Sequence, residues 1–153
     1  MHLAAFNIGI LRYAWDDPRI VDFADNIDRV NAVAQRSPGF VWQLHADAME
    51  AAQTAPDGPL GNNPRTASTL SVWTDLESLK GFVFNTVHKK FYDRRAEWYD
   101  VTAQGWNGQR LVLWHVQTGH RPTIADAVAR LTHLARHGDS DMGFGWDYAR
   151  NAA

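Results

Sequence analysis

The chain has 153 residues, 45% of them hydrophobic and 21% charged, which is typical of one globular domain. A formal net charge of −2, with no Lys/Arg run longer than a pair, argues against a nucleic-acid partner. The absence of cysteine excludes disulfides, thiolate metal sites and cysteine nucleophiles. The apolar stretch at residues 1–13 is too short to cross a bilayer and lacks the features of a signal peptide, so we expect no membrane partner and a cytoplasmic protein.

Two strands and a helix are predicted in the first third of the chain. Residues 2–13 alternate with apolar side chains on both faces, which indicates a strand that is buried on both sides. Residues 16–39 carry helix signals, with Asp16 or Asp17 as the cap, Pro18 in the first turn and a Ser-Pro-Gly stop. Residues 40–46 alternate as a second strand. The alternation predicts one face with Phe40, Trp42 and Leu44, and another with Val41, Gln43 and His45.

The remaining elements follow in order. Residues 47–66 form a long connection, which we expect to be a lid or a pocket wall, with a helical turn over 46–53. Strands are predicted over 66–73 and 109–118, and a continuous helix capped by Asp75 over 76–98. A further helix begins at the capping pair Thr123 and Asp126 and ends at Gly138, and a short final strand is expected over 142–148.

The order of these elements is β-α-β-β-α-β followed by a C-terminal helix. That order predicts a single α+β domain over residues 1–153, with the ferredoxin-like split β-α-β arrangement and helices on one face of the sheet. The strand at 109–118 is apolar on both sides, so the second face must also be covered. The economical cover is a second copy of the sheet, which predicts a homodimer built as a dimeric α/β barrel.

The segment FVFNTVHKKFYDRRAEWYD, residues 82–100, carries the strongest candidate for function. On a continuous helix, His88 would lie at the edge of the buried stripe, on a ridge with Phe84, Phe91 and Arg95. A histidine at a cavity rim is half-buried and titrates in a useful range. The alternative is a histidine bonded to a backbone carbonyl and water. For Tyr92 the alternative interpretation is a partly exposed ring rather than a catalytic phenol, and for Arg95 it is a simple charge on the helix surface.

Other candidate residues lie on the strands and on the last helix. His45 and His115 occupy the more polar faces of their strands, and they line one cavity with Asn7 and Trp73 if the strand parities agree. His133 and His137 have the i,i+4 spacing of a metal pair, but no third ligand is near them, so we expect no metal site. Gly-rich phosphate loops, G-x-S-x-G and H-E-x-x-H are all absent, so no nucleotide or flavin site is predicted.

Three segments, residues 6–44, 70–99 and 111–138, resemble the DUF3291 family of bacterial proteins in the same order. That family is similar to the antibiotic biosynthesis monooxygenases, and this resemblance implies the dimeric α/β-barrel fold. The pattern of the superfamily is a strand-end Trp, an acidic cap, a Phe and a helix His, which matches Trp73, Asp75, Phe82 and His88 here. The superfamily contains cofactor-free monooxygenases, haem proteins, isomerases and plain binding proteins, so the fold does not choose among them.

Three functional hypotheses follow. The first is a cofactor-independent, monooxygenase-like enzyme, or an isomerase or cyclase, acting on an aromatic or polyketide-like metabolite of natural-product biosynthesis. His88, Arg95 and Tyr92 are its candidate catalytic residues, with His88 as base and Arg95 as anion stabiliser. Its candidate substrate-binding residues are Asn7, Trp42, His45, Trp73, Phe84, Phe91, Trp98 and His115.

The second hypothesis is a haem protein with His88 or Tyr92 as the iron ligand. The haem-degrading branch of the superfamily has an Asn on the first strand, which Asn7 matches. That branch also has a Trp and a ligating His at the positions of Phe82 and Tyr92, and this departure weakens the match. The third hypothesis is a non-catalytic dimer that binds a small molecule.

Overall fold

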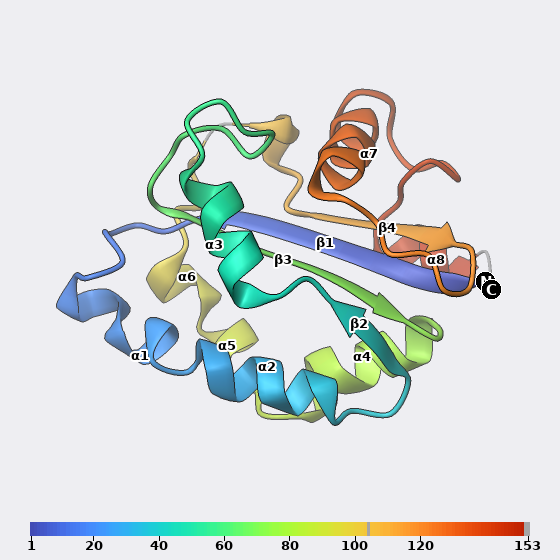
Figure 1. The fold of residues 1–153 in the computed structure, drawn as a ribbon, viewed down its shortest axis with the longest axis horizontal. Coiled ribbons are helices and arrows are strands. Elements are labelled where there is room, and N and C mark those ends of the chain that lie inside the picture. Colours follow the sequence, from blue (N-terminus) through green and yellow to red (C-terminus); the bar gives the residue numbers. More distant parts are fainter. Residues whose placement is uncertain (104, 152–153) are drawn as a thin grey trace.

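The computed structural model describes residues 1–103 and 105–151 and contains a four-stranded antiparallel sheet (Figure 1). Its strands are β1 (His2–Ile10), β2 (Phe40–Gln43), β3 (Thr66–Trp73) and β4 (Leu111–Val116), in the spatial order β2-β3-β1-β4. Every neighbouring pair is antiparallel. The predicted mixed α+β class and all four of these strands are confirmed, with shorter bounds for β1, β2 and β4.

Helices cover one face of the sheet, which we call the first face. These are α1 (Val21–Ala24), α2 (Ile27–Gln35), α4 (Leu76–Asn85), α5 (His88–Asp93), α6 (Arg95–Trp98) and α8 (Trp146–Asn151). Leu3, Trp73 and Leu113 of the strands pack there against Leu79 and Val83 of α4. Figure 1 shows α2, α4 and α5 together on this side of β1.

The opposite face, the second face, is covered by the same chain. The helices here are α3 (Ala46–Thr54) and α7 (Ile124–His137), and the short 3₁₀ turn η2 (Trp106–Gly108) adds Trp106. Phe6 and Trp114, both fully buried, pack in one cluster with Leu131 of α7. Figure 1 shows α7 beside β4, on the side of the sheet away from α2 and α4. The expectation that this face is covered is confirmed, but the cover comes from helices of the same chain and so gives no support for a second copy of the sheet. Homodimerisation stays a prediction without that support.

The expected helix over 16–39 is divided into three pieces, namely the 3₁₀ turn η1 (Pro18–Ile20), α1 and α2. The start is as predicted, because Asp17 accepts a hydrogen bond from the backbone N–H of Arg19 at 2.8 Å. The break falls at Asn26, whose side-chain Nδ2 donates to the carbonyl of Asp22 at 2.7 Å. Asn side chains compete with the helix backbone in this way, and periodicity does not reveal it.

The expected continuous helix over 76–98 is also wrong, since α4, α5 and α6 are separate. The break lies at Thr86, which has an extended backbone (φ −122°, ψ −174°). Its hydroxyl donates to the carbonyl of Phe82 at 2.6 Å and accepts from the backbone N–H of His88 at 3.2 Å. These local bonds replace helical ones, so the 100° spacing used to place side chains across residues 76–98 does not hold beyond Thr86.

The C-terminal region agrees with the sequence except at its end. Thr123 accepts from the backbone N–H of Asp126 at 3.1 Å, and α7 ends at Gly138, whose φ of 78° favours glycine. The final strand predicted over 142–148 is reduced to an isolated pairing of Phe144 with Leu113. After it the chain turns into α8, which packs on the first face. No helix in the described part of the chain is long and apolar enough to cross a membrane.

Candidate functional site

A cleft of about 670 Å³ lies at the β3 edge of the first face, between α2 and α5 on that face and α3, which covers part of the second face and reaches round this edge. Its floor comes from β1 and β3, through the facing positions Asn7, Thr69, Ser71 and Trp73. The helix α2 forms one wall and α3 the other, while α5 contributes His88 and Phe91. A space of this size suits a small molecule rather than a macromolecule.

The short strand β2 leaves room for this cleft. It ends at Gln43, whereas its neighbour β3 extends on to Thr66, so half of the β3 edge has no strand partner. The helix α3 occupies that position, and the Gln53 side chain accepts the backbone N–H of Ser68 at 2.9 Å. A helix cannot form the hydrogen bonds of a further β-strand, so the sheet is not extended here and the space beside the first face stays open. Residues of the 47–66 connection, among them Asp47, Glu50 and Pro64, line the cleft, and whether the connection also acts as a lid stays a prediction.

The imidazole of His88 is held in one orientation at this cleft. Its Nδ1 lies 3.0 Å from the carbonyl oxygen of Val83, which the break at Thr86 leaves without a helical partner. A carbonyl can only accept, so Nδ1 carries the proton and Nε2 of the neutral ring carries the lone pair. Burial lowers the pKa of His88 below its ordinary value, despite the carbonyl bond, which favours the charged form. His88 is therefore held as a neutral imidazole whose unprotonated nitrogen is Nε2, and no described residue bonds that atom.

The floor of the cleft presents neutral polar groups. The Asn7 carbonyl Oδ1 accepts from both the backbone N–H, at 3.0 Å, and the hydroxyl of Thr69 on the facing strand. This fixes the amide, so the Asn7 Nδ2 is left to donate to a ligand. The Ser71 hydroxyl accepts from Trp73 Nε1 at 3.0 Å and keeps its own hydrogen to donate. The floor can thus stabilise a developing negative charge on an oxygen without any cation.

Aromatic rings form the apolar part of the lining. Trp73 stacks on Phe82 with ring centroids 5.3 Å apart, and Phe82 lies 4.8 Å from the His88 ring. At the other end, the ring of Tyr99 lies against Gly9 of β1, where a side chain would collide with it. Burial raises the pKa of Tyr99, so its phenol is neutral at physiological pH. The lining therefore suits a flat, apolar ligand.

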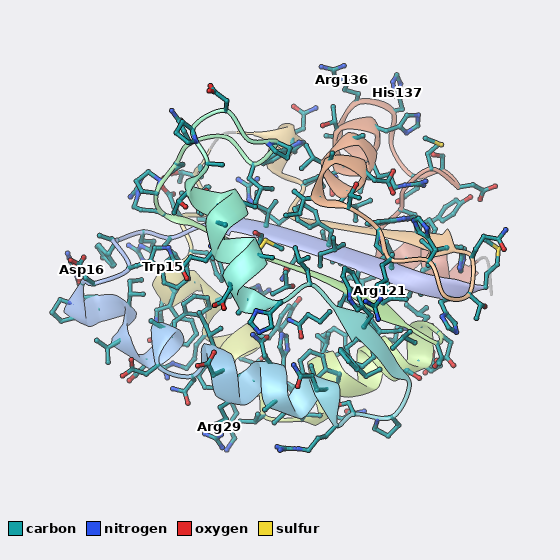
Figure 2. All side chains as sticks on the ribbon, viewed as in Figure 1. Trp15, Asp16, Arg29, Arg121, Arg136 and His137 are labelled. Carbon is teal, nitrogen blue, oxygen red and sulfur yellow. The ribbon has the colours of Figure 1, made fainter. Side chains whose placement is uncertain are left out.

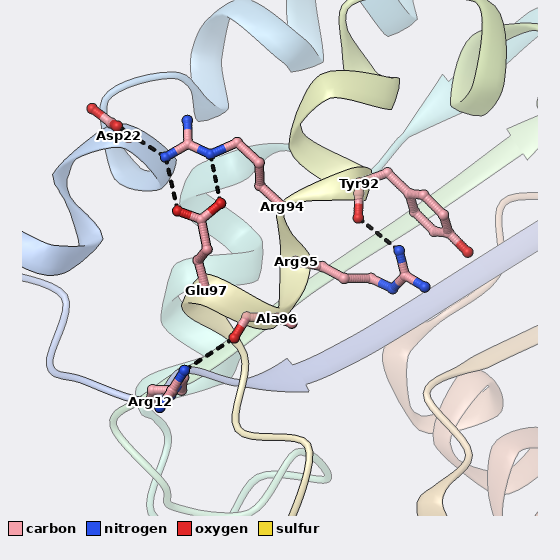
Figure 3. Close-up of polar contacts among 7 residues, drawn as sticks. All are labelled: Arg12, Asp22, Tyr92, Arg94, Arg95, Ala96 and Glu97. Carbon is pink, nitrogen blue, oxygen red and sulfur yellow. Dashed lines mark hydrogen bonds and ion pairs between the residues drawn. The ribbon is translucent and has the colours of Figure 1, made fainter.

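Two predicted catalytic residues lie outside the cleft. Arg95 is exposed, stacks its guanidinium 4.0 Å from the centroid of the Tyr92 ring, and donates to the Tyr92 carbonyl at 2.8 Å (Figure 3). Tyr92 packs edge-on against Phe84. The break at Thr86 accounts for this result, because it removes the ridge that would have placed Arg95 beside His88. Neither Arg95 nor Tyr92 is among the lining residues, although the Tyr92 ring lies near that of His88, with centroids 6.3 Å apart.

Five of the eight predicted substrate-binding residues also lie elsewhere. A register shift between Phe40 and Trp42 turns Trp42 to the second face, where it packs beside Leu44. His45 is exposed and caps α3 by accepting from the Asp47 N–H at 3.1 Å. The others line no part of the cleft: Phe84 packs on Trp146, Trp98 is buried behind Phe91, and His115 is exposed beside Phe144. Asn7, Trp73 and Phe91 do line it, with His88.

Several lining residues were not foreseen. Thr69 and Ser71 follow from the register that pairs Asn7 with Thr69 and Ala5 with Ser71, which a sequence does not fix. Asn31 accepts a hydrogen bond from Gln43 Nε2 at 3.1 Å and lines the cleft with it. Tyr99 had one available signal, a glycine at position 9 inside a strand, which marks a close approach.

Metal ligation receives no support from the described residues, in which no group of three or more His, Asp or Glu side chains could hold an ion. The rings of His133 and His137 do lie close together, with centroids 4.7 Å apart, on the outer part of α7. No third ligand in the described chain joins them.

Comparison with protein families identifies a match over residues 2–153 to the model described as a domain of unknown function, DUF3291. The chain belongs to the DUF3291 family. Comparison with curated proteins and with solved structures gave no significant match. Membership of DUF3291 thus supports the resemblance seen in the sequence, while function must be argued from the cleft itself.

Proposed function

We propose that this DUF3291 protein is a small-molecule enzyme that removes a proton from an aromatic or polyketide-like metabolite, most simply as the first step of a cofactor-independent oxygenation. The observation that carries the proposal is His88, a neutral imidazole whose Nδ1–H bonds Val83 and whose basic Nε2 belongs to a residue of the cleft. A general base needs this combination of fixed geometry and a pKa near or below neutrality.

The neighbouring groups support the same chemistry. His88 Nε2 takes a proton from a substrate hydroxyl or an acidic methylene, and the Asn7 amide and Ser71 hydroxyl donate hydrogen bonds to the resulting oxyanion. An electron-rich carbanion then reacts with O₂. In the balanced reaction a CH₂ group becomes a carbonyl, so one oxygen atom of O₂ enters the product and the other leaves as water. The aromatic wall of Trp73, Phe82 and Phe91 holds the ring and excludes water.

The fold proposal accompanies this function. We infer a ferredoxin-like split β-α-β arrangement, since β3 lies between β1 and β2 and antiparallel to both, and β1 lies likewise between β3 and β4. Likeness to the antibiotic biosynthesis monooxygenases and the dimeric barrel are proposals of the same kind. Light scattering at micromolar concentration tests the dimer, for which a mass near that of one 17.2 kDa chain would be the contrary result.

Oxygen uptake tests the enzymatic proposal. A panel of anthrones and hydroxynaphthalenes is offered to the wild type, to His88→Gln and to His115→Gln, with an oxygen electrode and product analysis. His115 is a matched control, because it lies on the same sheet face but outside the cleft. We expect turnover that falls at least about 100-fold in His88→Gln and is unchanged in His115→Gln. Equal turnover in His88→Gln would exclude His88 as the base, and ligand binding without conversion would favour the non-catalytic binding protein.

Haem is the second candidate, favoured by one feature. An Nδ1–H bonded to a backbone carbonyl is how proteins usually orient an iron- or zinc-binding histidine, and His88 has that bond. The rest of the cleft fits haem poorly, because no Lys or Arg lines it to pair with the two propionates. Tyr92 lies outside and is no ligand there. Titration with haem, followed by absorption, tests this alternative, and a Soret band that His88→Ala shifts would support it.

A further inference from the structure

The mouth of the cleft carries negative charge. Asp28 on α2, and Asp47 and Glu50 on α3, are exposed lining residues on two of its walls. Lining residues among the described part of the chain include no Lys or Arg. Arg29, the cation next to Asp28 in sequence, points away from the sheet at the lower edge of the molecule (Figure 2). Arg29 therefore does not neutralise the opening.

Stabilisation of helix N-termini explains the positions of only some of these acidic residues. Asp28 and Asp47 lie in the first turns of their helices, where a carboxylate offsets the partial positive charge of the N-terminus. Glu50 lies in the middle of α3 and has no such role. Within the described chain Asp28 and Glu50 form no ion pair, and Asp47 has only His45, 3.7 Å away. Glu50 is thus the residue whose charge has the least structural explanation.

The interior of the cleft, like its acidic mouth, favours a cationic ligand. The rings of Trp15, Phe23, Phe82 and Phe91 line the cleft, and aromatic faces attract cations as well as apolar rings. Trp15 lies near the outer end of the cleft wall formed by α1 and α2 (Figure 2). The polar groups of the floor are neutral amides and hydroxyls. Nothing in the lining would balance a carboxylate or phosphate, whereas an ammonium group would meet both carboxylates and rings.

We propose that the cleft selects an aromatic ligand that carries a protonated amine, and rejects aromatic carboxylates and phosphates. The proposal rests on the proposed function, since it assigns the substrate class of the same cleft. The aromatic ring lies over the floor near His88, and the ammonium group lies toward Glu50 and Asp28. Long-range attraction at the mouth acts mainly on the rate of entry and weakens with added salt.

Three probes that share the same naphthalene ring system test the charge preference: 2-(1-naphthyl)ethylamine, 2-(1-naphthyl)ethanol and 1-naphthaleneacetate. Binding to the full chain is measured by calorimetry and by saturation-transfer NMR at low and high salt. We expect the amine to bind about tenfold more tightly than the acetate at low salt, with the alcohol between them, and the ratio to shrink at high salt. An acetate that binds as tightly as the amine would overturn the proposal.

Two variants and a control locate the effect. Glu50→Gln and Asp28→Asn remove the charge with little change in shape, and we expect each to narrow the amine-to-acetate ratio about two- to fivefold. Glu77→Gln on α4, an exposed acid outside the cleft, leaves the ratio unchanged. A ratio that neither cleft variant moves contradicts the proposal, as does a failure of all three probes to bind. Oxygen uptake in His88→Gln tests the base separately, so failure of the charge preference and failure of the proposed function are distinguishable.

Discussion

A single added methyl group at Gly9 tests how tightly the cleft is built. A Cβ at this position would lie 2.3 Å from both Cδ1 and Cε1 of the Tyr99 ring, well inside the 3.5–4.0 Å of an ordinary carbon contact. The ring must therefore move by more than about 1 Å. The backbone of Tyr99 cannot move away easily, because its N–H donates to the Arg95 carbonyl at 2.8 Å and Tyr99 pairs with Leu11.

We expect Gly9→Ala to destabilise the fold by about 2 kcal/mol, within the range for overpacking a well-packed site. For a chain of this length that loss lowers the melting temperature by roughly 4–8 °C. Because Tyr99 lines the cleft, the displaced ring also narrows it, and ligand affinity falls in parallel. Thermal and urea unfolding, followed by circular dichroism, measure the first effect, and calorimetry with the naphthyl probes measures the second.

Gly81→Ala on α4 is the matched control, since no atom lies within 4 Å of a Cβ there. A glycine inside a helix costs roughly 0.5–1 kcal/mol relative to alanine, so this variant should be more stable than the wild type. In a Tyr99→Ala background, Gly9→Ala should lose most of its effect. A Gly9→Ala protein within about 0.5 kcal/mol of the wild type would refute the close packing of Tyr99 on β1.

Three further predictions concern stability and the cleft. Burial lowers the pKa of His88, so around and below about pH 6.5 the unfolded chain binds more protons than the folded one. Between about pH 7.5 and 5.5, the free energy of unfolding measured by urea titration should therefore fall more for the wild type than for His88→Gln. Equal losses in the two proteins would contradict this prediction. Asp75→Ala removes the cap that accepts the Ser78 N–H at 2.8 Å, so we expect a loss of about 1 kcal/mol in chemical unfolding, and no loss would argue against that cap. Arg95→Ala should leave probe affinity unchanged by calorimetry, because Arg95 lies outside the cleft, and a fivefold change would place it at the site.

The parts of the fold with strong local signals were predictable. The strand β3 has the predicted bounds, and α7 is capped by Thr123 and Gly138, the two residues that the sequence indicated as its start and end. The order of elements also predicted the mixed α+β class. The sequence did not indicate what covers the second face of the sheet, because the apolar side of α7 does not say which surface it packs against. Either this helix or a second chain could have covered that face.

The site was predictable only in part, for a similar reason. Of the candidate residues, the cleft brings together His88, Asn7, Trp73 and Phe91, but their neighbours depended on two interruptions of regular geometry. The extended backbone at Thr86 separates Arg95 from His88, and the register shift before Trp42 moves that side chain to the other face. Periodicity assumes uninterrupted elements, so a side-chain bond from one threonine or a single bulge overturns it.

The state of the His88 ring tests the central claim most directly. Nitrogen-15 NMR of the histidine side chains, assigned with His88→Gln, reports which ring nitrogen carries the proton and at what pH the ring titrates. We predict a neutral ring protonated at Nδ1, with a pKa below about 6.5 and shifts at Nε2 when an aromatic ligand binds. A ring protonated at Nε2, or a pKa above that value, would contradict the assignment of His88 as the base of this cleft.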